Sequence, residues 1–247
     1  MKLTKFFTAV ALFASTALQA QTAPKWLRYA AISPDGTTIA FTYKGDIYTV
    51  PASGGNATLL TMHEAHDFMP VWSRDGKQVA FASDRYGNFD VFVIAANGGT
   101  AQRITYHSTN EYPYDFTPDG KFVVFGAARG DVANSRLYPT GYMPELYQVA
   151  VTGGRPKQIL GTPAEDIRFN TNGTQFLYHD KKGQENAWRK HQTSSVARDI
   201  WLYDAASGKH TKLTNFAGED RTPVFAEGDK TIYYLSEASG SFNVHKM

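Results

Sequence analysis

The chain has 247 residues, of which 14% are aromatic, and it contains no cysteine. The absence of cysteine excludes a disulfide framework, a thiol nucleophile and a cysteine metal site. The formal net charge of +2 comes from Lys2 and Lys5. Without its first 20 residues the chain is neutral, so its charge gives no reason to expect nucleic acid or a membrane surface as a partner.

The amino terminus has the pattern of a targeting segment. Lys2 and Lys5 precede the apolar stretch 6–18, which is too short to span a bilayer comfortably, and Ala20 is a small residue suited to cleavage. We therefore predict a signal peptide over residues 1–20 and a periplasmic or secreted location. After cleavage we expect no membrane span. The alternative is an uncleaved anchor, whereas a lipoprotein anchor is excluded because no cysteine follows.

A unit of four short strands begins at Pro70 and ends at Thr105. Asp75-Gly76 supplies the tight turn after the first strand, because glycine readily takes the positive φ that such hairpins need. Gly98-Gly99 makes the turn before the fourth strand. The predicted strands are 71–73, 79–82, 90–94 and 102–105. This pattern indicates a four-stranded antiparallel meander.

The same unit recurs along residues 21–247. The second strand reads IAF, VAF, VVF, FLY and IYY in successive units, and a turn containing glycine precedes each of them. A repeat of about 40 residues with four strands is the spacing of a β-propeller blade. The predicted blades are approximately 26–61, 70–105, 113–160, 166–214 and 223–247. The last ends after its third strand and is therefore incomplete.

The strand composition supports an all-β propeller of about five antiparallel four-stranded blades. The runs VAFA and DVFVIA are apolar at nearly every position, as expected for a sheet covered on both faces. A β-sandwich with coincidental turns is the alternative fold. Two arrangements remain open for the last blade. One is an open ring with exposed strand edges, and the other is a closed ring in which residues 22–29 supply the missing strand.

Two long insertions, 127–144 and 180–198, lie between the second and third strands of their units. In such a meander these loops share one face with the crossovers between blades, and loop-rich faces of rigid scaffolds often carry function. Aromatic side chains in loops favour contacts with partners. We therefore predict that Tyr138, Tyr142 and Trp188 contact a peptide or another domain. The alternative is that the loops cap their own blades.

Acidic residues recur in the crossovers just before the innermost strands. The candidates are Asp67, Glu111, Asp166 and Asp220. A ring of carboxylates at the channel mouth would attract a peptide amino terminus or a cation. Alternatively, these acids cap backbone amides or pair with arginines such as Arg85 or Arg221.

We assign no catalytic residue, no metal site and no cofactor. His63 and His66 have the His-x-x-His spacing, with Glu64 and Asp67 beside them, but the stretch reads as a loop and lacks the His-Glu-x-x-His pattern. The chain also lacks a Gly-x-Ser-x-Gly elbow and a phosphate-binding glycine-rich loop. Ser194-Ser195 near His191 fits loop polarity better than a nucleophile.

Several segments carry a family resemblance. The chain contains WSRDGKQVAFASDRYGNFDVFVI and ISPDGTTIAFTYKGDIYTVPASGG, which resemble the propeller repeats of TolB-like proteins and tricorn-type peptidases. It also contains EYPYDFTPDGK, YHDKKGQENAWRKHQTSSVARDIWLYD and FAGEDRTPVF, which are similar to the amino-terminal propeller of bacterial tricorn protease homologues. The resemblance covers the whole chain after residue 20.

The resemblance implies the amino-terminal propeller of a secreted or periplasmic tricorn-like serine peptidase. In that family a second propeller, a PDZ domain and a serine peptidase domain follow. The propeller would admit or gate peptide substrates and contact those domains, without being catalytic itself, and a homo-oligomer is possible. One alternative is a TolB-like periplasmic protein-binding propeller without enzymatic activity. Another is a sugar- or metal-binding propeller with its site at the channel.

Overall fold

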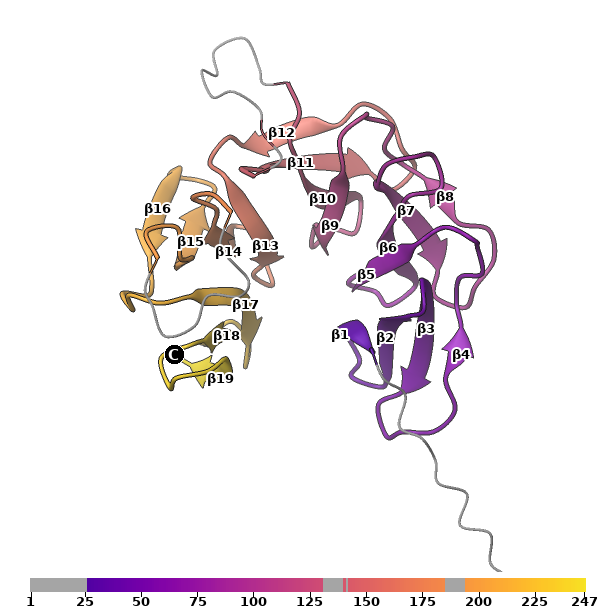
Figure 1. Cartoon of the computed structure of the whole chain (residues 1–247), viewed down its shortest axis with the longest axis horizontal. Coiled ribbons are helices and arrows are strands. Elements are labelled where there is room, and N and C mark those ends of the chain that lie inside the picture. Colours follow the sequence, from indigo (N-terminus) through magenta and orange to yellow (C-terminus); the bar gives the residue numbers. More distant parts are fainter. Residues whose placement is uncertain (1–25, 131–139, 141, 185–193) are drawn as a thin grey trace, which may run out of the picture.

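The computed structural model describes residues 26–130, 140, 142–184 and 194–247. Within these residues the regular elements are β-strands, and none of the described chain forms a helix able to cross a membrane. The strands form five antiparallel sheets, four with four strands and a fifth with three. Successive sheets follow one another around an arc whose two ends are the first and the fifth (Figure 1). This confirms a five-bladed, all-β propeller with an incomplete last blade.

Each blade is a meander whose first strand lies innermost. The first blade has β1 (Arg28–Ile32), β2 (Thr38–Tyr43), β3 (Asp46–Pro51) and β4 (Thr58–Leu59). The second has β5 (Asp67–Trp72), β6 (Gln78–Ser83), β7 (Asp90–Ala95) and β8 (Gln102–Arg103). The third has β9 (Glu111–Phe116), β10 (Phe122–Ala127), β11 (Glu145–Ala150) and β12 (Lys157–Leu160). The fourth has β13 (Ala164–Phe169), β14 (Gln175–Asp180), β15 (Ile200–Asp204) and β16 (Lys209–Lys212), and the fifth has β17 (Asp220–Ala226), β18 (Thr231–Ser236) and β19 (Asn243–Lys246).

The first strand of the chain belongs to the first blade. Arg28 of β1 pairs with Thr42 of β2. The closed-ring alternative required Tyr29 to lie in a strand of the fifth sheet, but Tyr29 belongs to β1 of the first sheet. Residues 22–25, which that alternative also used, lie outside the described residues. The outer edge of β19 has no paired strand among the residues that the structure describes.

The hairpin turns form where the Asp-Gly pairs predict them. Gly76 has φ = 69°, a value that glycine adopts without the steric cost other residues meet. Asp75 Oδ1 accepts hydrogen bonds from Ser73 Oγ at 2.7 Å and from the Lys77 amide at 3.1 Å. These bonds hold the pKa of Asp75 below its usual value, the Ser73 bond contributing most. The turn therefore fixes the register of the two strands it joins.

One aromatic pair recurs in every blade, across the second and third strands. In the second blade, Phe81 of β6 stacks on Phe92 of β7 with ring centroids 5.7 Å apart. The equivalent pairs are Phe41–Tyr48, Phe125–Tyr147, Tyr178–Trp201 and Tyr234–His245. Directly opposed aromatic side chains stabilise antiparallel pairs beyond the area they bury. This pair is a second sequence signature of the repeat.

The apolar core lies between successive sheets. One cluster packs the first blade on the second through Ile47, Trp72 and Phe81, and others join the second to the third and the third to the fourth. The middle strands β6 and β7 are accordingly buried on both faces. At the two ends of the arc the sheets are more open, with Ile32 60% and Val244 69% exposed.

The loops between second and third strands lie beside the crossovers, as the topology predicts. Asn88 Nδ2 donates to the carbonyls of His107 and Thr109 in the crossover to the third blade, both at 3.0 Å. The His66 amide donates to Asp84 Oδ1 at 2.7 Å in the same way. Parts of both long insertions lie outside the described residues.

Candidate functional site

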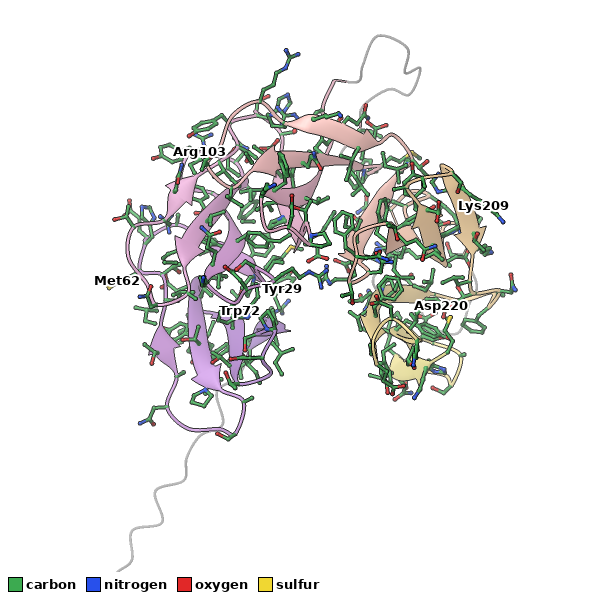
Figure 2. All side chains as sticks on the ribbon, turned by 180° about the vertical axis from the view of Figure 1, so that it is seen from behind. Tyr29, Met62, Trp72, Arg103, Lys209 and Asp220 are labelled. Carbon is green, nitrogen blue, oxygen red and sulfur yellow. The ribbon has the colours of Figure 1, made fainter. Side chains whose placement is uncertain are left out.

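The innermost strands of the five blades surround a central cavity of about 530 Å³, which we call the channel. Strands β1, β5, β9, β13 and β17 each contribute side chains to its lining. Figure 2 shows Tyr29 on the inner side of the first blade, whereas Met62, Arg103 and Lys209 lie at the outer rim. A central cavity on a rigid scaffold is the usual place for a ligand site in such a fold.

A β-bulge interrupts every innermost strand. The pairing register shifts once in β1, β5, β9, β13 and β17. Tyr29, Met69, Asp166 and Thr222 occupy these bulges with φ of 51°, 55°, 52° and 55°, and all four line the channel. Such left-handed backbone is strained for residues other than glycine and is concentrated at functional sites. Bulges also redirect side chains, and in the first, second, fourth and fifth blades the bulge residue lines the channel.

One side of the channel is aromatic. This aromatic wall consists of Tyr29, Phe68 and Tyr112, from β1, β5 and β9. Phe68 makes edge contacts with Tyr29 at 5.3 Å and with Tyr112 at 5.7 Å between ring centroids, and Phe89 packs behind it at 4.8 Å. Burial raises the pKa of Tyr112, and the neighbouring Tyr29 and Glu165 add to the effect. Tyr112 lines the same cavity as Glu165.

The opposite side is charged. This charged wall consists of Glu165, Asp166 and Arg168 of β13, together with the uncharged Thr222 of β17. Glu165 Oε2 lies 3.3 Å from His179 Nε2, 3.0 Å from Lys181 Nζ and 3.5 Å from Arg198 Nη2. Burial acts to raise the pKa of Glu165, but the hydrogen bond and charge of His179 and the charge of Lys181 outweigh it, and the pKa is lowered to about 2. The charge of Glu165 is thus balanced within the protein.

Asp166 has different neighbours. Its Oδ2 accepts a hydrogen bond from Thr222 Oγ1 at 3.2 Å and lies 3.9 Å from His179 Nδ1. The Thr222 amide donates to the same Nδ1 at 3.2 Å. Among the described residues, no lysine or arginine forms an ion pair with Asp166. Its carboxylate lines the channel beside Thr222 and His179, whereas Glu165 lies against a lysine and an arginine.

Arginines tie the blades together beside the channel. Arg168 Nη1 donates to the carbonyls of Tyr114 and, at 2.7 Å, Ile167. Arg74 Nη2 lies 2.8 Å from Asp115 Oδ2 and 3.1 Å from the Phe169 carbonyl oxygen. Burial raises the pKa of Asp115 despite Arg74 and Arg168 nearby. These contacts join the second, third and fourth blades beside the channel.

Three of the four predicted acids do not line the channel. Asp67, Glu111 and Asp220 are at most 1% exposed and are the first residues of β5, β9 and β17, because these strands begin earlier than the sequence analysis expected. Asp67 pairs with Arg85 at 2.6 Å and Glu111 with Arg129 at 2.9 Å. At these two positions the structure has the arginine pairing that the sequence left as the alternative. Arg221, by contrast, lies 3.7 Å from Glu219.

The structure describes one of the three predicted loop aromatics, Tyr142. Tyr142 is 57% exposed, and Tyr138 and Trp188 lie outside the described residues. Their contact with a partner stays a prediction. The rings of His66 and Phe68 lie 5.1 Å apart, and His63 Nδ1 accepts the Ala65 amide. No three histidine, aspartate or glutamate side chains of the described residues are grouped to hold a metal ion.

Sequence reasoning missed the side chains that line the channel, apart from Asp166. It did not select Tyr29, Phe68, Tyr112 or Thr222. A signal was present, because Pro70, Pro113 and Pro223 fall inside innermost strands, where proline is confined to edges and bulges. A proline within an otherwise regular strand pattern would have marked the bulge in these three blades.

Comparisons with known proteins agree with this architecture. The chain matches the family described as the tricorn protease N-terminal β-propeller domain over residues 24–247. The solved tricorn protease aligns with a TM-score of 0.74 at 19% identity over 91% of this chain and 21% of that chain. A putative TolB from Agrobacterium tumefaciens aligns with a TM-score of 0.73 at 15% identity, covering 91% of this chain and 78% of that one. TolB from Acinetobacter baumannii aligns with a TM-score of 0.65 at 19% identity over 90% of this chain and 51% of that chain.

A comparison with curated proteins gave no match. At these identities the solved structures show the fold alone. The chain spans about a fifth of the tricorn protease and about half of the Acinetobacter protein.

Proposed function

The chain belongs to the tricorn protease N-terminal β-propeller family, and on this premise we propose that it is the substrate-admitting propeller of a tricorn-like serine peptidase. The observation that carries the proposal is the channel, a cavity of about 530 Å³ lined by an aromatic wall and a charged wall. A peptide has both apolar side chains and polar backbone groups, so it matches both walls. The family match supports a place within a larger peptidase.

In this proposal the chain binds and the rest of the protein cleaves. The aromatic wall contacts apolar side chains of an extended peptide, and the charged wall contacts its polar groups. The downstream PDZ and peptidase domains, with which the loop-rich face makes contact, supply the catalytic residues. Residues 1–20 would direct the protein to the periplasm or the exterior, where it would meet peptide substrates.

The test narrows the channel without disturbing the core. Ala30 is exposed on β1 and lines the channel, so Ala30→Trp places an indole in the cavity. The matched control is Ala52→Trp, which changes another exposed alanine, in the turn between β3 and β4. Both variants are made in the protein expressed from its complete gene. Hydrolysis of a peptide of about ten residues is then compared with hydrolysis of a small chromogenic ester.

We expect Ala30→Trp to lower kcat/KM for the peptide several-fold while the ester and the Ala52→Trp control are unaffected. Equal peptide hydrolysis by both variants would contradict admission through this channel. If the complete protein hydrolyses neither substrate, the peptidase proposal fails. A TolB-like binding module would then become the better account, since a TolB structure shares most of its chain with this fold.

A further inference from the structure

The four bulge residues of the channel are chemically unequal. Tyr29 and Met69 are apolar or aromatic, Thr222 is neutral, and Asp166 alone carries a charge. Each is held at positive φ, so the backbone, and not side-chain flexibility, determines which group the channel presents. The specificity of the channel should therefore depend on Asp166.

The charge of Asp166 is available, whereas neighbouring charges are engaged. Lys181 and Arg198 lie against Glu165, and Arg168 donates to two backbone carbonyls. Among the residues that the structure describes, Asp166 contacts Thr222 and His179 and forms no ion pair with a lysine or arginine, and its side chain is 26% exposed. A carboxylate in a partly enclosed cavity binds a cation more strongly than one in open water, because the lower dielectric strengthens the attraction.

The aromatic wall complements that charge. The electron-rich faces of tyrosine and phenylalanine attract an ammonium group when it lies near the ring. Tyr29, Phe68 and Tyr112 line the same cavity as Asp166, so both walls face one enclosed volume. Tyr114 of β9 also lines this cavity.

We propose that Asp166 and the aromatic wall of Tyr29, Phe68 and Tyr112 bind a primary ammonium group, the free amino terminus of a peptide. Asp166 accepts the charged hydrogen bonds, and the rings cover the apolar first side chain. This inference rests on the proposed function and adds to it the group by which the peptide is recognised. The four-acid ring considered from the sequence thus reduces to one carboxylate.

The experiment compares three probes on the full chain by isothermal titration calorimetry. They are a tetrapeptide with a free amino terminus, the same peptide acetylated, and cadaverine, a diamine without peptide groups. The variant is Asp166→Asn, because asparagine tolerates positive φ and preserves the bulge. The control is Asp229→Asn, which removes an aspartate at φ = 67° in the turn between β17 and β18, outside the channel lining.

We expect the wild type and Asp229→Asn to bind the free peptide on the order of tenfold more tightly than the acetylated one, as one charge-assisted contact allows. Asp166→Asn should bind both peptides equally and weakly. Equal affinity of the wild type for both peptides would overturn the inference while leaving peptide admission standing. Binding of cadaverine but of neither peptide, lost in Asp166→Asn, would support the ammonium site and count against the proposed function. If Asp166→Asn still bound the free peptide more tightly than the acetylated one, the inference would also be overturned.

Discussion

The two walls of the channel are held in place by different forces. The strands of the aromatic wall are fixed by apolar packing and by separate acid–arginine pairs, such as Asp67–Arg85 within the second blade and Arg74–Asp115 between the second and third. The charged wall depends on a network across the fourth and fifth blades, in which Arg198 contacts both Glu165 and Glu219. The shape of the aromatic wall therefore depends mainly on burial, whereas the shape of the charged wall depends on charge and on the protonation of its acids. Substitutions that separate these contributions test the comparison.

The largest effect is expected at Asp67, under the aromatic wall. Asp67→Asn leaves Arg85 charged and only 15% exposed without its partner. Removing one member of a buried pair costs about 3–5 kcal/mol in free energy of unfolding. Chemical denaturation measures this loss.

The matched control is Glu227→Gln, in a pair whose members are both about half exposed. Exposed pairs contribute about 0–1 kcal/mol. Equal costs for the two substitutions would show that burial of the Asp67 pair has no importance.

The charged wall should respond to acid. The pKa of Glu165 is about 2 in the folded protein and about 4.3 in an unfolded chain. A lowered pKa stabilises the fold at pH values above the unfolded pKa, and this stability, roughly 2–3 kcal/mol, is lost as the pH falls toward 2. Denaturation midpoints measured between pH 5 and 2 should decline in the wild type and decline less in Glu165→Gln.

Glu111 is the contrasting residue, at the start of the aromatic-wall strand β9. Burial raises its pKa, so its linkage to stability has the opposite sign. Glu111→Gln should therefore retain the acid-dependent decline. If the denaturation midpoint of Glu111→Gln did not change with pH, while that of Glu165→Gln declined as in the wild type, the acid-sensitive charge would belong to the aromatic wall instead.

A smaller effect is expected where Tyr114 packs on Gly126 of the neighbouring strand. A Cβ at position 126 would lie 2.5 Å from Tyr114 Oη and 2.6 Å from Cε2, closer than atoms can approach. Gly126→Ala should cost about 1–3 kcal/mol, because overpacking forces the ring to move. Gly130→Ala is the control, since nothing lies within 4 Å of its Cβ position. Thermal melting that is equal for both would show that Tyr114 is not confined.

The smallest effect on stability is expected at Tyr142, outside both walls. Its side chain is 57% exposed, so Tyr142→Ala should change the free energy of unfolding by less than about 0.5 kcal/mol. A clear fall in melting temperature of the chain would favour the capping role of this loop over a contact with a partner.

Most of the fold could be predicted from the repeat, because turn residues and strand composition act locally. Gly76 and its equivalents identify hairpins without reference to the rest of the chain, and Phe81 and Phe92 sit in strands that were correctly located. The channel depended on register. A one-residue bulge in β13 brings Asp166 into the channel lining, and because the sequence does not show where the register shifts, Asp67 and Asp166 were indistinguishable.

The most direct test of the account is to locate a bound peptide in the channel. The probes are two versions of one free-amino peptide, with photo-leucine at position 1 or at position 3, cross-linked to the full chain and mapped by mass spectrometry. The account predicts that position 1 attaches within the channel to β13, β17 or the facing aromatic residues, and that Asp166→Asn abolishes this product. Attachment to the outer rim, near Met62, Arg103 or Lys209 (Figure 2), or identical products from Asp166→Asn, would contradict it.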